Sequence, residues 1–427
     1  MDAGDRFRKR TGRNDALAIL SLSAVVKHRR KNNHRGEPLD RQAYLFRSLK
    51  RPEEINALRR IYGSNLIVIG IHSPRQARVD NLAERIAKSH FSAQRDQYRD
   101  KAEALVLRDE SDERKQFGQR LRSAFAMADA FLDSSDHLQL RDNTTRFLNL
   151  LFGKPIVTPS PDELAMAHAH VAAMRSAELG RQVGAAIADG WGNLIAMGTN
   201  EVPKPHGGYY WDGDSNDGRD WSRGFDSSDT FKHASLGELL QVLAENKMLS
   251  TILRSLSTEE QIKRLSPLIK QTRYMQLIEF IRAAHAEMGA LLDAAARGVS
   301  VRDCTMYVTT FPCHECARNI IAAGIKRVVY IEPYAKSLAL ELHEHAIQLD
   351  TAADMSKIPF VPFLGIAPKH YSDMFMMDQR KTDNGKTIPW DAAGANPRVS
   401  GSFWSYLQYE KEDLKLLRDT LKKKGFV

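Results

Sequence analysis

The chain has 427 residues, of which 42% are hydrophobic, and a formal net charge of +9. This length and apolar content exclude an intrinsically disordered protein and predict two or three folded domains. Residues 1–150 carry 30 basic and 20 acidic side chains, whereas residues 151–427 carry 32 and 33, so the positive excess is N-terminal. This asymmetry indicates either a polyanionic partner or basic helices that face solvent.

The apolar run Ala16–Val26 is too short to cross a bilayer, and no longer apolar run follows. We interpret it as part of an amphipathic core helix. The three cysteines are explained below without a disulfide, which is typical of the cytosol. The sequence therefore predicts a cytoplasmic protein without a membrane segment.

Residues 1–150 have helical periodicity around one clear strand, 66–71, which ends at 72–75 before another helix. This pattern predicts a small α/β domain. The sequence contains no G-x-x-x-x-G-K-[ST] phosphate-binding motif, and Gly385-Lys386-Thr387 is expected to be a turn.

The second predicted domain, 158–370, begins with a proline-rich segment that leads into a helix over 162–179. A hairpin is expected next, followed by a long polar loop and an inserted helical segment. Helices and strands then alternate, which predicts a largely parallel sheet covered by helices on both faces. The predicted elements are strands 182–188 and 194–199, loop 206–229, insertion 231–282, a helix from about 285, strand 304–311, helix 313–323, strand 326–332, helix 335–348 and strand 358–362. Residues 371–427 are expected to form an extension with a helical tail.

The motifs His285-Ala286-Glu287 and Pro312-Cys313-His314-Glu315-Cys316 supply the parts of a hydrolytic zinc site. One imidazole and two thiolates leave the fourth tetrahedral position of zinc open, as in catalytic sites. His285 and Glu287 converge only if His285 lies at the first turn of a helix, and Pro312 indicates a second helix start. The pattern H-x-E…P-C-x-x-C is typical of zinc nucleobase deaminases, in which the Glu moves protons.

A C-x-x-C motif alone also fits a redox pair or half of a structural zinc knuckle, but the upstream His-Ala-Glu favours the catalytic interpretation. His314 and Glu315 are expected to face outward from their helix rather than bind metal. Cys304 lies in an apolar run and is expected to be a buried strand cysteine.

Several segments resemble the cytidine and deoxycytidylate deaminase superfamily over about residues 160–370. These are Arg181-Gln182-Val183-Gly184-Ala185, Gly198-Thr199-Asn200, the His-Ala-Glu motif, 309–317 and 324–330. The whole architecture looks like bacterial anti-phage dCTP/dCMP deaminases, whose N-terminal domain is a P-loop domain. The resemblance implies a three-layer cytidine-deaminase fold, preceded by a smaller α/β domain that resembles a partial P-loop NTPase domain without its Walker A motif.

The resemblance also implies that Asn200 contacts the deoxyribose or the base, and that Thr310 and Phe311 line the base pocket. Tyr334 and Lys336 follow a predicted strand at its carboxyl end, where ligands bind in such sheets, and are expected to reach the phosphate. Two arginines of the polar loop are alternative phosphate clamps. They are Arg219 and Arg223.

The expected activity is hydrolytic deamination of dCMP or dCTP, with zinc held by His285, Cys313 and Cys316 and protons moved by Glu287. Depletion of dCTP during phage replication is the role that the resemblance implies, with a homo-oligomer as the assembly and a small RNA or a nucleotide as effector of the N-terminal domain. Three alternatives stay open. They are a housekeeping dCMP deaminase, a polynucleotide deaminase that stacks bases on Tyr209, Tyr210, Trp211 and Trp221, and a non-enzymatic RNA-binding zinc scaffold.

Overall fold

The structure is a computed structural model of the chain. It describes residues 1–33, 36–110, 112, 116–270, 272–334, 336–349, 354–377, 379–398 and 403–425, with 403–405 described by their backbone alone. Two compact units make up the chain: 1–163 together with 362–427, and 164–361. The C-terminal segment 371–427 is thus part of the same unit as the N-terminal residues. None of the helices in these ranges is long and apolar enough to span a membrane.

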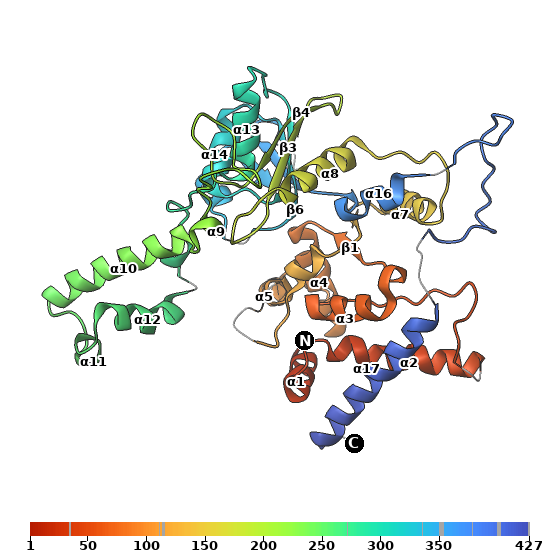
Figure 1. The fold of residues 1–427 in the computed structure, drawn as a ribbon. Helices are drawn as coiled ribbons and strands as arrows, with labels where there is room; N and C mark the ends of the chain where they lie inside the picture. Colours follow the sequence, from red (N-terminus) through yellow and green to blue (C-terminus); the bar gives the residue numbers. More distant parts are fainter. Residues whose placement is uncertain are drawn as a thin grey trace. The chain divides into compact units, whose positions relative to one another are not determined.

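The N-terminal unit is largely helical, and its C-terminal helix α17 (Phe403–Lys423) packs on α2 (Ala16–Asn32) (Figure 1). Apolar residues of the two helices share one core, and the buried Arg29 forms an ion pair with the buried Glu410. The remaining helical elements of this unit are α1 (Asp2–Thr11), α3 (Pro52–Tyr62), η1 (Gly63–Asn65), α4 (Arg75–Ser89), η2 (Asp96–Tyr98), α5 (Arg99–Glu110), α6 (Leu121–Phe125), α7 (His137–Leu151), η4 (Pro368–His370) and α16 (Tyr371–Phe375).

The sheet of this unit has the order β1 (Ile69–His72), β2 (Ala130–Asp133) and β9 (Gly365–Ile366), with β1 and β2 parallel. The strand predicted over 66–71 begins later, at Ile69, and ends at His72. Val68 stays outside the strand, because its N–H donates to the Asp129 carboxylate instead of to a neighbouring strand. The short strands β2 and β9 were not predicted, since four and two residues are too few to show a periodic pattern.

The second unit contains a six-stranded mixed sheet with the order β4-β3-β5-β6-β8-β7. Its strands are β3 (Gly184–Ala188), β4 (Leu194–Thr199), β5 (Thr305–Thr310), β6 (Arg327–Glu332), β7 (Ile347–Leu349) and β8 (Ile358–Pro362). β3 is antiparallel to both β4 and β5, whereas β5 is parallel to β6 and β7 to β8. The predicted hairpin of β3 and β4 is confirmed, and Gly192 in its turn has a φ of 86° that suits glycine.

Helices cover both faces of this sheet (Figure 1). α8 (Pro161–Met174) approaches Gly184 so closely that a Cβ there would lie 1.9 Å from the Ala169 carbonyl oxygen. α13 (Ala286–Ala296) approaches Gly198 in the same way, with the Ala286 carbonyl oxygen 2.1 Å from such a Cβ. The second glycine therefore allows the start of α13 to rest directly on β4.

Three predicted helical segments need correction. The helix predicted over 162–179 ends at Met174, and the insertion 231–282 is helical only in part. The helix predicted over 335–348 is wrong. Its described residues, 336–348, hold only α15 (Ala339–Leu342) and most of β7, whose Ile347 is buried and pairs with β8. A short apolar run does not reveal whether it pairs in a sheet. The insertion and the loop before it contain α9 (Asp220–Arg223), α10 (Ser227–Glu245), α11 (Thr251–Arg254), α12 (Thr258–Ile269) and η3 (Tyr274–Gln276). Helix α13 follows the insertion, and helix α14 (His314–Ala322) follows β5.

Candidate metal centre

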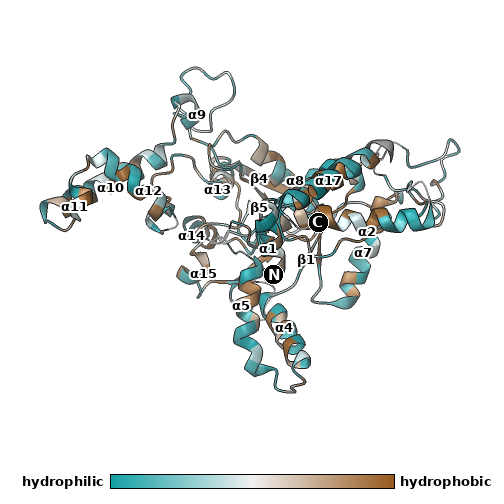
Figure 2. Cartoon of the chain, turned by 90° about the horizontal axis from the view of Figure 1, so that it is seen from below, coloured by the Kyte–Doolittle hydropathy of each residue, from teal (hydrophilic) through white to brown (hydrophobic). Residues whose placement is uncertain are grey.

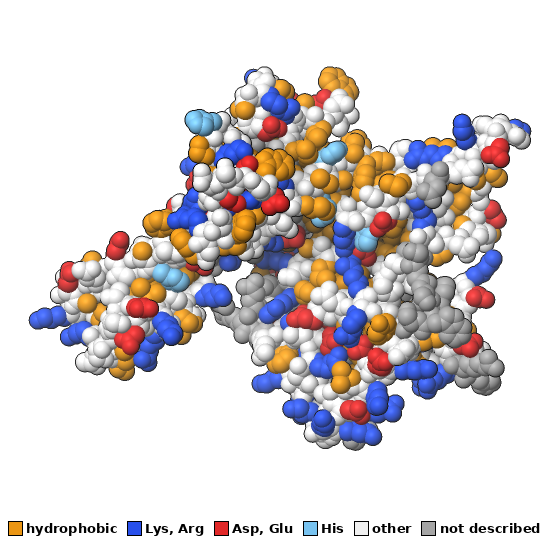
Figure 3. Space-filling view, viewed as in Figure 1, with side chains coloured by type: hydrophobic (Ala, Val, Ile, Leu, Met, Phe, Trp, Pro, Cys, Tyr) orange, Lys and Arg blue, Asp and Glu red, His pale blue; other side chains and the backbone are white. Residues whose placement is uncertain are grey.

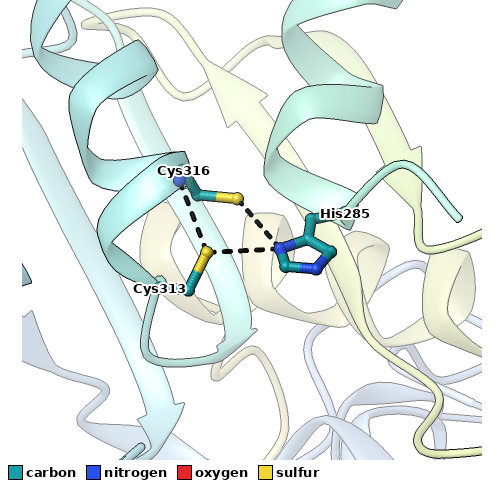
Figure 4. A group of neighbouring side chains, drawn as sticks. All are labelled: His285, Cys313 and Cys316. Carbon is teal, nitrogen blue, oxygen red and sulfur yellow. Dashed lines mark hydrogen bonds between the residues drawn. The ribbon is translucent and has the colours of Figure 1, made fainter. Parts of the chain in front are cut away.

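The three predicted zinc ligands meet at the N-termini of α13 and α14 (Figure 4). His285 is the N-cap residue of α13 and has an extended backbone conformation. Cys313 is the N-cap residue of α14, and its Sγ accepts a hydrogen bond from the Cys316 N–H at 3.4 Å. Both predicted helix starts are confirmed. The positive ends of two helices therefore face the three side chains, which favours thiolates there.

The geometry of the three side chains suits zinc. The Nδ1 of His285 lies 3.3 Å from the Sγ of Cys313 and 3.3 Å from the Sγ of Cys316, and all three atoms lie within 4.8 Å of one another. Zinc bonds of about 2.0–2.3 Å to nitrogen and sulfur require such ligand separations. Within the described ranges no other His, Cys, Asp or Glu joins this group. The donor set thus fits a zinc ion with one coordination position left for another ligand.

Burial and mutual contact shift the acidities of these ligands. Hydrogen bonding with Cys313 raises the pKa of His285 to about 9, although burial opposes this. The hydrogen bond with Cys316 lowers the pKa of Cys313 to about 4, and that same contact, with burial, raises the pKa of Cys316. The two cysteines therefore hold one proton tightly, because two adjacent thiolates would repel each other. A bound divalent cation would offset that repulsion and allow the proton to leave.

Glu287 lies in the first turn of α13, and it is only 4% exposed. Burial raises its pKa to about 7, although the nearby His285 opposes the shift. A carboxyl group with such a pKa exchanges protons near neutral pH, as a general acid and base must. Since Glu287 lies outside the ligand cluster, it remains available for this task.

Three residues near the ligands in sequence, Cys304, His314 and Glu315, lie outside the cluster, as predicted. Cys304 is buried next to β5, with its Sγ 3.7 Å from the Arg302 carbonyl oxygen, and burial raises its pKa. Glu315 pairs with Arg318 on the surface of α14. His314 is half-buried rather than fully outward-facing, and its Nδ1 has no hydrogen-bond partner in the described chain.

The structure uses Asn200 to hold the backbone beside the centre. Its Oδ1 accepts from the Val183 N–H at 2.7 Å, and its Nδ2 donates to the Arg181 carbonyl oxygen at 2.6 Å. Each side-chain atom of Asn200 keeps one further hydrogen-bonding position. Thr310 is half-buried at the end of β5, whereas the Phe311 ring packs into the core against Tyr330 and Phe360.

The four predicted phosphate-binding residues have different surroundings. Tyr334 is half-buried near Cys313, and Lys336 is exposed two residues later. Arg219 is 6% exposed, donates to Asp217 at 2.7 Å and contacts Glu201 at 3.8 Å. Arg223 is the last of the four; it is half-exposed and donates a hydrogen bond to the Ser227 hydroxyl group. Arg219 is thus engaged inside the loop, whereas Tyr334 and Lys336 follow β6 near the centre.

Glu201 is a positioning residue that the sequence analysis missed. It is 1% exposed, and its carboxylate accepts from the N–H groups of Ala177 and Val202, both at 2.9 Å. Its backbone pairs with Ala284, the residue before His285, through two hydrogen bonds of 3.2 and 3.0 Å. An acidic residue directly after a buried strand was the only signal for it in the sequence.

Comparison with known proteins identifies the region that carries this centre. Residues 159–332 match the family model of the cytidine and deoxycytidylate deaminase zinc-binding region. This segment is similar to a deaminase zinc-binding region. The match includes all three ligands and Glu287, which supports zinc as the metal of the centre.

Two of the similar curated proteins are the deoxycytidylate deaminases of a phage and of Homo sapiens. The enzyme of Enterobacteria phage T4 is 51% identical over 53 residues, which are 12% of this chain and 28% of the phage enzyme. The Homo sapiens enzyme is 28% identical over 169 residues, which are 40% of this chain and 63% of that enzyme. This chain therefore spans less than two thirds of either relative.

A solved structure is also similar in part. The dCMP deaminase of cyanophage S-TIM5, crystallised with dCMP and dUMP, is 17% identical, and the match covers 48% of this chain and 99% of that one with a TM-score of 0.27.

Proposed function

We propose that the chain hydrolyses the amino group of a deoxycytidine nucleotide, giving the deoxyuridine nucleotide and ammonia. The observation that carries this proposal is that a buried carboxyl group, that of Glu287, accompanies the cluster of His285, Cys313 and Cys316. The cluster lies at the N-termini of α13 and α14. A structural zinc site needs no such free carboxyl group. The zinc ion, when bound, supplies a Lewis acid that activates a water molecule at neutral pH.

Glu287 performs the proton transfers of this reaction. Its carboxylate takes a proton from the attacking water and passes it to the ring nitrogen N3 while the water oxygen bonds to C4. It then takes the second water proton and delivers it to the amino nitrogen, so that the C4–N bond breaks and ammonia leaves. The pKa of about 7 lets Glu287 accept and return a proton at little cost.

A free nucleotide is favoured over a polynucleotide as substrate, because arginine side chains already lie over three aromatic rings of the polar loop. The Arg175 guanidinium lies 3.8 Å from the centre of the Trp211 ring and 5.4 Å from that of Tyr209. The Arg219 guanidinium lies 5.5 Å from the centre of the Trp221 ring. Ring faces that neighbouring arginines already occupy are not open to stacking with successive bases.

Tyr334 and Lys336 are the residues that we propose for the substrate phosphate, ahead of Arg219 and Arg223. Their support is the position of Tyr334 beside Cys313 and the exposure of Lys336, whereas Arg219 is already paired. Lys336→Ala should raise the KM for the nucleotide while leaving that for deoxycytidine unchanged. The double variant Arg219→Ala and Arg223→Ala is the comparison, and a larger KM effect there would reverse the assignment.

The direct test of the proposed function is a deaminase assay on dCMP, dCTP, deoxycytidine and a single-stranded oligonucleotide. We expect turnover of dCMP or dCTP and none of the oligonucleotide. Preference for dCTP would agree with the resemblance to anti-phage deaminases, and phage plaque counts with the active chain and with Glu287→Ala would test that role. Absence of turnover on all four substrates by the zinc-loaded chain would contradict the proposal.

A further inference from the structure

A large cleft lies entirely within the N-terminal unit and has no part in the proposed deamination. Its volume is about 1130 Å³, and it lies between α2, the segment 42–50, α4 and α5. Pockets for small molecules commonly measure about 300–1,000 Å³, so a nucleotide fits inside. The cleft belongs to one compact unit, and therefore its walls come from elements that fold together.

One wall of the cleft is a continuous stripe of α2. The side chains that form it are small or apolar and recur at helical spacing, so they lie on one face of the helix. They are Leu17, Ala18, Ser21, Ala24 and Val25. α4 and α5 form another wall with Leu82, Leu105 and Val106, and Figure 2 shows hydrophilic and hydrophobic turns alternating on these two helices. Two apolar walls suit a flat apolar body such as a nucleobase.

The cleft carries an excess of positive charge. Five cationic side chains and two carboxylates line it, and the cationic ones are Arg8, Arg47, Lys50, Arg78 and Arg85. Three of them are paired: Arg8 with Asp5, Lys50 with Asp109 and Arg78 with Glu110, at 2.6 to 2.8 Å. Figure 3 shows basic and acidic side chains interspersed over the visible face of this unit.

Arg47 and Arg85 remain without an ion-pair partner anywhere in the described chain, and both are exposed at the cleft. Guanidinium groups bind phosphate oxygens through paired N–H donors. Each of the two arginines therefore offers phosphate-binding donors that no acidic residue in the described part of this unit occupies.

Asp109 provides a second, independent sign of a ligand. Its Oδ2 accepts from Lys50 at 2.6 Å, but its Oδ1 is buried and has no hydrogen-bond partner among the described residues. An unsatisfied buried carboxylate oxygen costs stability unless a donor reaches it. A ligand that fills the cleft thus needs an N–H or O–H group as well as an anionic group and an apolar body.

We infer that this cleft binds a nucleotide, with its phosphates on Arg47 and Arg85, its base between the apolar walls, and an amino or hydroxyl group donating to Asp109. A nucleotide combines all three features, and inorganic phosphate supplies only the first. The inference does not depend on the proposed deaminase activity, because the cleft and the metal centre lie in different units.

The test measures binding of ATP, dTTP and inorganic pyrophosphate to the full zinc-loaded chain by calorimetry. The protein carries Glu287→Ala, so that no substrate is consumed. We expect ATP or dTTP to bind at least tenfold more tightly than pyrophosphate. Arg47→Ala with Arg85→Ala should weaken nucleotide binding at least tenfold, and Ala24→Trp, which fills the cleft from an exposed position of α2, should abolish it.

The matched control is Arg30→Ala with Lys415→Ala, which removes the same charge from exposed positions that do not line the cleft. This control should bind nucleotide like the parent, and thermal melting should show that every variant is folded. Three results would overturn the inference: no nucleotide binding at millimolar concentration, an equal loss in the control, or binding that disappears when a chelator removes zinc. A single-stranded RNA is the fourth probe. RNA that binds more tightly than the nucleotides, and that the control variant weakens as much as the cleft variant, would overturn the inference in favour of a polynucleotide surface.

Discussion

Glu287 in the second unit and Asp129 in the N-terminal unit are equally buried, with 4% of each exposed, but they are held in opposite ways. Asp129 accepts from the Val68 N–H at 2.7 Å, from Lys369 and His370 at 2.9 Å each, and from Arg59. Burial raises its pKa, but the hydrogen bond of His370 and the charge of Lys369 outweigh burial, so the pKa is lowered. Asp129 is therefore an anion that fastens the segment after β9 to the rest of its unit.

Glu287 has no lysine or arginine among the causes of its pKa shift, and burial dominates, so its pKa rises to about 7. The comparison shows that burial alone does not determine the role of a carboxyl group. The hydrogen-bond donors and cations around a carboxyl group determine whether it is a permanent anion that stabilises the fold or a group that transfers protons. If this difference holds, a change at one of the two carboxyl groups leaves the other region unaffected.

The largest effect is expected from Cys313→Ser, which removes a thiolate ligand. Zinc content and deaminase activity should both be lost, because one imidazole and one thiolate do not hold the ion. The matched control is Cys304→Ser, which should keep both, with a stability loss of about 1–3 kcal/mol from burying a hydroxyl group. Metal analysis beside a deaminase assay tests the pair, and loss of zinc in the control would require another ligand set.

Glu287→Ala should lower kcat by about 100- to 10,000-fold, the usual range for general acid and base catalysis. Zinc content should stay at the parent level because Glu287 lies outside the ligand cluster. Single-turnover kinetics and metal analysis of one preparation separate the two quantities. A zinc-free variant would make Glu287 a ligand and would remove the contrast with Asp129.

The metal centre could be predicted from the sequence because all its chemistry lies in two short motifs. The spacing of His285 and Glu287 required a helix start, and that of Cys313 and Cys316 required a shared helix face; the structure has both features. The strands β3, β4, β5, β6 and β8 were likewise predicted to within two residues, because apolar runs bounded by turn residues indicate strands.

The contacts between distant segments could not be predicted in this way. The pairing of β9 with β2 joins residues 365–366 to 130–131, and α17 packs on α2 from the other end of the chain. Glu201 and Asp129 carry no local pattern, because their roles come from partners distant in sequence. Periodicity reports which face of an element is apolar and not which element covers it.

Asp129→Asn should destabilise the N-terminal unit by about 1.5–3 kcal/mol, the usual value of hydrogen bonds to a charged group. The loss should be near the lower limit, because Arg59, Lys369 and His370 are each about 30% exposed and can turn to water. Zinc content and kcat should be unchanged. Urea unfolding followed beside metal analysis tests this, and a loss of zinc would show that the two regions are coupled.

The smallest effect is the pH dependence of that stabilisation. The folded-state pKa of Asp129 lies below its ordinary value of about 3.9, so the folded protein binds the proton less readily than the unfolded chain. The stabilisation is therefore complete above about pH 5 and is lost as the pH falls through the ordinary pKa towards the lowered one. The side chains that face Asp129 are those of Arg59, Lys369 and His370, with Asp373 3.4 Å from His370. The difference in melting temperature between the parent and Asp129→Asn should thus be constant from pH 7 to 5 and shrink below pH 4. A difference that grows as the pH falls would mean that the Asp129 carboxyl group is protonated in the folded protein, as burial alone would make it.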